Sequence, residues 1–131
     1  MPHFILEYTD NLPDHADVPG VLAKVNAALI AEGGVFPIGG IRARAIRLTE
    51  YAVADGSGDY GFAHATLKIG AGRDQATRDR VCGRLFEILK SHFARTAEEM
   101  GFALSLELIE FSEGGVLKHN NLHKRLAARD Q

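Results

Sequence analysis

The chain has 131 residues, of which 46% are hydrophobic and 24% charged, and this composition suits a single globular domain spanning 1–131. Its net charge of −2 excludes the bulk attraction to nucleic acid or acidic lipid that a basic protein has, so we expect no nucleic acid and no membrane partner. Cys82 is the only cysteine, and no apolar run approaches the roughly 18 residues of a membrane span, so we expect a soluble, cytoplasmic protein without an intrachain disulfide.

The first half of the chain, residues 2–56, predicts a strand, a helix and a second strand. His3–Thr9 is rich in residues that favour strands and ends at an Asp-Asn turn signal. Asp17 is suited to cap a helix whose apolar residues recur at helical spacing, and the glycine pair at Gly33 would end it. Ile41–Val53 follows as a long, irregular strand that a glycine-rich turn breaks.

The second half, residues 59–111, repeats this order. Tyr60–Ile69 alternates as a strand, and a turn leads from it into the longest helix, which Gly101 ends. The helix has one apolar stripe, formed by Val81, Leu85, Ile88, Leu89, Phe93, Ala97 and Met100. Ala103–Phe111 is the last strand of this unit.

Two consecutive strand–helix–strand units predict two right-handed, parallel βαβ units in one four-stranded mixed sheet. With both helices on one face, the expected fold class is α/β, in the form of a two-layer α+β sandwich. The C-terminal tail, 112–131, adds a weak helical pattern over Val116–Ala128.

A sheet with helices on one face leaves its other face open, and the last two predicted strands carry apolar residues on both faces. The third strand has Tyr60 and Phe62 on one face, with Ala63, Leu67 and Ile69 on the other. The last strand has Leu104, Leu106 and Leu108 on one face, with Ala103, Ile109 and Phe111 on the other. Three copies packed around a threefold axis would bury such an apolar face, so we expect a homotrimer.

Pro2 follows the initiator methionine, and a proline in this position normally becomes the N-terminus because methionine aminopeptidase tolerates small second residues. A free N-terminal proline has a secondary amine, a base that no internal residue supplies. An α-amino group titrates at about 7.7–8.0, near the value that suits a general base, and burial or nearby cations lower that pKa. Pro2 is therefore a candidate catalytic base, although Met-Pro is also a common start without a catalytic role.

Arginines are candidates for binding an anionic substrate. Arg42 and Arg44 alternate along the second predicted strand and would project from one face, whereas Arg47 falls on the other. Arg73 stands in the glycine-rich turn before the longest helix, where backbone N–H groups and the helix dipole favour an anion. A guanidinium can bind a carboxylate through two hydrogen bonds, and the alternative for each arginine is a solvated side chain.

Six histidines raise the question of a metal site. His119 and His123 would share a helical face, but no third ligand is evident, so we expect no metal. His64 stands in an apolar strand and is expected in the core or in an interface. Cys82 has no evident base to activate it and is expected to be a structural thiol.

Five sequence blocks in order resemble the 5-carboxymethyl-2-hydroxymuconate isomerase family. They are PHFILEYTDN, VPGVLAKVN, GGVFPIGGIRAR, TLKIGAGR and KHNNLH, and they run from Pro2 to about Lys124. The first and fourth blocks are the most specific. The family belongs to the tautomerase superfamily, together with 4-oxalocrotonate tautomerase and macrophage migration inhibitory factor.

The resemblance implies a homotrimer of double-βαβ subunits, with an active site at the start of the first strand near a subunit interface. It places the family's catalytic proline on Pro2 and its two carboxylate-binding arginines on Arg42 and Arg73. The implied reaction is the ketonisation of 5-carboxymethyl-2-hydroxymuconate, a small polycarboxylate dienol, in homoprotocatechuate (4-hydroxyphenylacetate) breakdown, with no cofactor or metal. Phe4 and Phe36, neighbours in sequence of Pro2 and Arg42, are expected to form apolar walls of the site.

Two alternatives stay open at this point. A relative within the superfamily can run another reaction on the same scaffold, such as phenylpyruvate tautomerisation, decarboxylation or dehalogenation. The chain can also be a trimeric binding module without catalysis, because a fold alone does not determine function.

Overall fold

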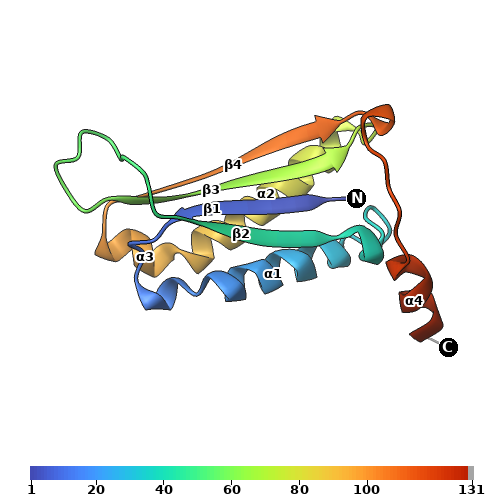
Figure 1. The fold of residues 1–131 in the computed structure, drawn as a ribbon, viewed down its shortest axis with the longest axis horizontal. Helices are drawn as coiled ribbons and strands as arrows, with labels where there is room; N and C mark the ends of the chain where they lie inside the picture. The colour runs from blue at the N-terminus through green and yellow to red at the C-terminus, as the bar shows by residue number, and fades with distance from the viewer. Residues whose placement is uncertain (130–131) are drawn as a thin grey trace.

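The computed structural model describes residues 1–129 as a sheet with helices against one of its faces (Figure 1). The strands are β1 (His3–Thr9), β2 (Arg42–Leu48), β3 (Gly61–Gly70) and β4 (Phe102–Phe111). The α-helices are α1 (Val18–Ala31), α2 (Gln75–His92), α3 (Ala94–Glu99) and α4 (Leu122–Arg129). Short 3₁₀ turns are η1 (Asp14–Ala16), η2 (Ile38–Gly40) and η3 (Glu113–Gly115). Within residues 1–129, no helix has both the length and the apolar character needed to cross a membrane.

The strands lie in the order β2-β1-β3-β4, which confirms the predicted four-stranded mixed sheet built from two βαβ units. β1 is parallel to β2 and β3 is parallel to β4, while β1 and β3 are antiparallel where the two units meet. The bounds of β1 are those predicted. This topology brings the starts of β1 and β2 to the same edge of the sheet as the ends of β3 and β4.

The core lies between the sheet and the layer formed by α1 and α2 (Figure 1). Because side chains alternate along a strand, Phe4 and Leu6 of β1 point towards the helices and are fully buried. Buried residues of β3, α1 and α2 complete the core, and they include Ala63, Ala65, Leu67, Ile69, Val21, Val25, Leu29, Val81, Leu85, Leu89 and Phe93. His3, Ile5 and Glu7, which alternate with the two core residues of β1, are partly exposed and belong to the open face.

The ends of α1 are set by the residues that the sequence indicates. Asp17 has a left-handed backbone, with φ of 45°, and its carboxylate accepts a hydrogen bond from the Gly20 N–H at 3.1 Å. A Cβ at Gly20 would lie 2.1 Å from Asp17 Oδ2, so the cap requires glycine there. After the helix, Gly33 and Gly34 both have positive φ and turn the chain towards the next strand.

β2 is shorter than predicted, since it ends at Leu48 and not at Val53. It lies at the edge of the sheet and pairs with β1, whose last residue, Thr9, stands opposite Leu48. One further main-chain bond joins the Asp10 N–H to the Leu48 carbonyl at 3.1 Å. Beyond it the chain leaves the sheet, and Tyr51 Oη donates to the Asp10 carboxylate at 2.7 Å. The strand stops because its partner stops.

The longest predicted helix is interrupted, so the prediction of one continuous helix is wrong near its C-terminal end. α2 ends at His92 and α3 begins at Ala94, with Phe93 at φ −95° and ψ 11° between them. Phe93 is 1% exposed and packs on Phe102, with 5.4 Å between ring centroids. His92 Nε2 donates to the Ala16 carbonyl at 2.6 Å. These two anchors hold the backbone where the helical path breaks.

The open face of the sheet is mixed in character and not the apolar patch predicted. Leu104, Leu106 and Leu108 of β4 pack against the core on the helix side, so the helices cover them. Ile46 and Ile109 are 47% and 39% exposed on the open face. Polar and charged residues share this face, among them His3, Arg44, His64, Lys68 and Glu107.

Candidate active site

The sequence-predicted site residues meet at one edge of the sheet. Pro2 directly precedes β1, Arg42 is the first residue of β2, and Arg73 lies in the loop from β3 to α2. The Arg42 N–H donates to the Pro2 carbonyl at 3.1 Å. Figure 1 shows the N-terminus at the edge where β3 and β4 end. The antiparallel pairing of β1 with β3 therefore gathers residues that are far apart in the sequence.

Arg73 is held against this edge by contacts of its own guanidinium. Nη1 donates to the Gly70 carbonyl at 3.1 Å, and Nη2 donates to the Val35 carbonyl at 2.9 Å. The guanidinium carbon lies 4.7 Å from the centre of the Phe36 ring, in a cation–π arrangement. Gly72, at φ 118°, allows the tight return of the loop. The guanidinium has further N–H donors, which these bonds leave available for a carboxylate.

Arg42 points back towards η2 and the N-terminus. Its Nη1 donates to the Gly40 carbonyl at 3.0 Å. Met1 packs closely against Gly40: a Cβ added at Gly40 would lie only 3.3 Å from the Met1 Cα. Among the side chains that the structure describes, no carboxylate lies within ion-pair distance of Arg42 or Arg73. Both cations can therefore receive an anion from outside the chain.

The amino group at the N-terminus stands among these cations. Burial lowers the pKa of the Met1 amine below its usual value, and the positive charges of Arg73, Lys118 and Arg42 lower it further. Pro2, the next residue, is buried. An amine with a lowered pKa is neutral, and so able to accept a proton, at a lower pH than an ordinary α-amino group.

A cleft of about 310 Å³ opens beside the N-terminus. The first part of the chain and the tail line it together, through Met1, Pro37 and Gly40 and through Lys118, Asn120 and His123. The sequence motif KHNNLH supported the family resemblance but carried no predicted role. Its place in the cleft depends on a contact between residues 81 positions apart, Asn120 and Gly39, which no local pattern encodes.

The two predicted apolar walls lie elsewhere. Phe4 and Phe36 are 0% and 2% exposed and belong to the core. Alternation along β1 directs Phe4 towards the helices, away from the open face. Phe36 acts on the site indirectly, because its ring supports the guanidinium of Arg73. The prediction of Phe4 and Phe36 as walls is therefore wrong.

Arg44 lies on the open face of the sheet and lines a separate hollow with His3 and Lys68. It donates through Nη1 to His3 Nδ1 at 3.1 Å, since a guanidinium has no acceptor. Burial, and then the positive charges of Arg44 and Arg42, hold the pKa of His3 below its usual value. A neutral His3 ring is the form that accepts this bond.

His64 and Cys82, also considered from the sequence, lie outside the candidate site. His64 lies on the open face and not in the core, with Nδ1 2.6 Å from Ser105 Oγ and Nε2 3.1 Å from Glu107 Oε1. Burial raises the pKa of the Cys82 thiol, and the negative charge of Asp79 raises it further. A raised pKa disfavours the reactive thiolate, which fits the structural role expected of Cys82.

The histidine pair of the tail does not share a helical face as predicted. α4 begins at Leu122, so His119 precedes the helix and only His123 lies in it. His123 packs closely on η2, because a Cβ at Gly39 would lie 2.8 Å from its Nδ1. Among the side chains that the structure describes, no three of His, Cys, Asp or Glu are placed to hold a metal ion together.

Comparison with known proteins finds close relatives over nearly the whole chain. A model of the family described as 5-carboxymethyl-2-hydroxymuconate isomerase matches residues 2–126. The 5-carboxymethyl-2-hydroxymuconate Delta-isomerase of Escherichia coli is 46% identical over 123 residues, covering 94% of this chain and 97% of that protein.

Solved structures agree with this result. The crystal structure of a 5-carboxymethyl-2-hydroxymuconate isomerase from Deinococcus radiodurans R1 matches with a TM-score of 0.91 and 48% identity, over 95% of this chain and 93% of that chain. A fused wild-type 4-OT symmetric trimer matches with a TM-score of 0.63 and 13% identity, over 89% of this chain and 93% of that chain. The second likeness concerns the fold alone.

Proposed function

The chain belongs to the 5-carboxymethyl-2-hydroxymuconate isomerase family, and from this we propose that it converts 5-carboxymethyl-2-hydroxymuconate to its 2-oxo isomer, with the amine of Pro2 as general base. The observation that carries the proposal is the convergence of the N-terminus with Arg42 and Arg73 beside a cleft. The 46% identity to the Escherichia coli isomerase supports the choice of substrate.

The proposed base forms when Met1 is removed. While Met1 is present, the Pro2 nitrogen is an amide and has no useful basicity. After removal it is a secondary amine, one residue further into the same cationic surroundings that lower the pKa of the Met1 amine. The same burial and charges would lower the pKa of the Pro2 amine and favour its neutral form, which can accept a proton.

The three carboxylates of the dienol match the positive charge at this edge of the sheet. In our proposal Arg42 and Arg73, whose charges act at the N-terminal amine, bind two of the carboxylates through the N–H donors that their main-chain bonds leave available. Neutral Pro2 takes the proton of the enol hydroxyl, and the electron pair moves through the conjugated system to form the ketone. The protonated amine then delivers a proton to the carbon that bears the carboxymethyl group. An arginine at the 2-oxo acid end stabilises the charge that develops on the oxygen.

The proposed reaction moves one proton and shifts double bonds, so its balance requires no oxidant and no cofactor. A substrate panel tests the assignment. We expect fast turnover of the tricarboxylate dienol and slow or no turnover of phenylpyruvate, halogenated acrylates and decarboxylase substrates. Preferred turnover of one of these other compounds would replace the proposed substrate. A cytoplasmic location stays a prediction.

The activity is expected to persist to lower pH than an ordinary α-amino base would allow. The neutral amine is the active form, so the acid limb of kcat/KM falls where the amine becomes protonated. Because the charge of Arg73 lowers the amine pKa, Arg73→Ala should raise that pKa and move the acid limb to higher pH. Arg47→Ala is the control, because it also removes one positive charge, but at the other end of β2, far from the amine. An unmoved limb in Arg73→Ala would contradict this placement of the amine.

We also propose that the chain forms a homotrimer through the open face of the sheet, with active sites near the subunit boundaries. Ile46 and Ile109 are exposed there, and the cations Arg44 and Lys68 share the face with the carboxylate of Glu107. A face that carries both charges and apolar residues suits a closed symmetric contact, in which cations can meet carboxylates of the next subunit and apolar side chains can pack together.

Sedimentation at micromolar concentration should show one species of about 42 kDa, the mass of three chains that each weigh 14.2 kDa before Met1 is removed. Ile46→Lys should dissociate it, because the substitution places a charge within the proposed contact. Ile30→Lys is the matched control, since Ile30 is 45% exposed on α1, in the other layer. A stable and active monomer would contradict the trimer.

A further inference from the structure

The tail is fastened to η2 by a single asparagine and a close glycine contact. Asn120 Nδ2 donates to the Gly39 carbonyl at 3.1 Å, and Asn120 Oδ1 accepts from the Leu122 N–H at 2.6 Å. His123 packs on the same glycine, because a Cβ at Gly39 would lie 3.0 Å from the His123 main-chain nitrogen. Figure 1 shows the tail running from the end of β4 past the edge of the sheet to α4. The tail is therefore placed as one wall of the cleft.

Lys118 stands two residues before this fastening point and lines the cleft with Met1 and Gly40. Its positive charge, with those of Arg73 and Arg42, lowers the pKa of the N-terminal amine. Among the described side chains, no carboxylate lies within ion-pair distance of Lys118. Lys118 is thus a third cation near the N-terminal amine, beside Arg73 and Arg42, and it lines the cleft directly.

We propose that Lys118 is a specificity-determining residue that binds the carboxymethyl carboxylate of the substrate, and that Asn120 is the positioning residue that holds it there. This inference rests on the proposed function. The substrate has three carboxylates, and the arginines account for two. The planar guanidinium matches the rigid carboxylates of the conjugated chain, whereas the compact ammonium of a flexible lysine suits a carboxylate on a freely rotating methylene.

The experiment compares two dienols that differ in one carboxylate: 5-carboxymethyl-2-hydroxymuconate and 2-hydroxymuconate, which lacks the carboxymethyl group. Rates are measured above the acid limb of every variant, so that protonation of the amine does not contribute. Lys118→Ala should raise KM for the tricarboxylate about tenfold, because the substrate loses one charged hydrogen bond, while kcat changes little. Its KM for 2-hydroxymuconate should stay near the wild-type value, and Lys118→Arg should recover most of the loss.

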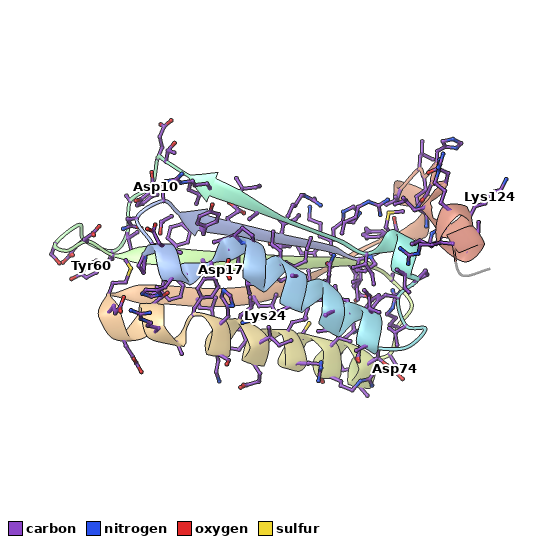
Figure 2. All side chains as sticks on the ribbon, turned by 90° about the horizontal axis from the view of Figure 1, so that it is seen from below. Asp10, Asp17, Lys24, Tyr60, Asp74 and Lys124 are labelled. Atoms are coloured by element: carbon purple, nitrogen blue, oxygen red, sulfur yellow. The ribbon has the colours of Figure 1, made fainter. Side chains whose placement is uncertain are left out.

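The matched control is Lys124→Ala, because Lys124 is an exposed lysine of α4 in the same tail (Figure 2). It should leave KM for both substrates unchanged. Asn120→Ala should reproduce the selective rise of Lys118→Ala, and the double variant should be no worse than Lys118→Ala alone, since both changes remove one interaction.

The outcomes separate the two proposals. If the wild type turns over the tricarboxylate and Lys118→Ala behaves like Lys124→Ala, this inference is overturned and the proposed function stands. An equal rise of KM for both dienols also overturns it, because Lys118 would then not recognise the carboxymethyl group. A wild type without activity on either dienol overturns both proposals.

Discussion

A chain with one residue placed before Pro2, or one that keeps Met1, is expected to lose its isomerase activity. In both cases the Pro2 nitrogen becomes an amide, so the proton acceptor of the reaction disappears while the cations of the cleft stay. Pro2→Ala, once processed, keeps an amine in the same position but makes it primary. Its activity should fall substantially without vanishing, as measured by the loss of the dienol absorbance.

The control for this experiment is the same residue added after Gln131. That variant should keep wild-type activity, which separates the chemical effect of blocking the amine from any effect of chain extension. Intact mass must be recorded for each preparation, because the state of the N-terminus is the variable under test. Full activity in a chain proven to retain Met1 would remove Pro2 from the mechanism.

Of Arg73→Ala and Arg42→Ala, the variant whose lost guanidinium stabilises developing charge is expected to reduce the rate by roughly 10²–10³, the usual cost of deleting one such donor. The kinetic constants separate their roles. An arginine on the 2-oxo acid end should lower kcat, whereas one that only binds a carboxylate should raise KM with kcat little changed.

Arg73 also has a structural part, because it bonds the carbonyls of Gly70 and Val35 and lies over Phe36. Thermal unfolding of Arg73→Ala is therefore measured beside its kinetics, and Arg73→Lys tests whether charge alone restores the rate. Arg47→Ala controls for the loss of a positive charge from β2. Wild-type kinetics in both Arg73→Ala and Arg42→Ala would show that the carboxylates bind elsewhere.

The parts of the fold that local sequence determines were predictable. β1 has the predicted bounds because its seven residues are rich in types that favour strands and end at a turn signal. α1 begins at the cap formed by Asp17, whose hydrogen bond to Gly20 lies within one helical turn. Signals of this kind act over three or four residues and need no knowledge of the rest of the chain.

The errors arose where a distant partner decides the outcome. β2 stops at Leu48 because β1 stops opposite it, although Tyr51–Val53 favours a strand by composition. The break at Phe93 depends on Phe102 and on the bond from His92 to Ala16, the last residue of η1. Neither cause is visible in the helical periodicity of α2 itself.

In the site, too, the residues with a local sequence signal were predicted, and those placed by distant contacts were not. Arg42 and Arg73 were identified as candidates from residue type and turn context, and the strand order explains why they meet at the N-terminus. Lys118 was missed because its place depends on the fastening of Asn120 to Gly39 across 81 positions. Phe36 was misplaced because nearness in sequence to Arg42 does not determine which face of the chain its ring occupies.

The central claim is tested most directly by the ketonisation of 5-carboxymethyl-2-hydroxymuconate in D₂O, with a preparation whose intact mass shows that it begins at Pro2. We predict rapid loss of the dienol and a 2-oxo product that carries deuterium on the carbon bearing the carboxymethyl group. The position of the deuterium reports where the amine delivers its proton. Dienol loss at the rate of buffer alone, in a trimer with an intact N-terminal proline, would contradict the account.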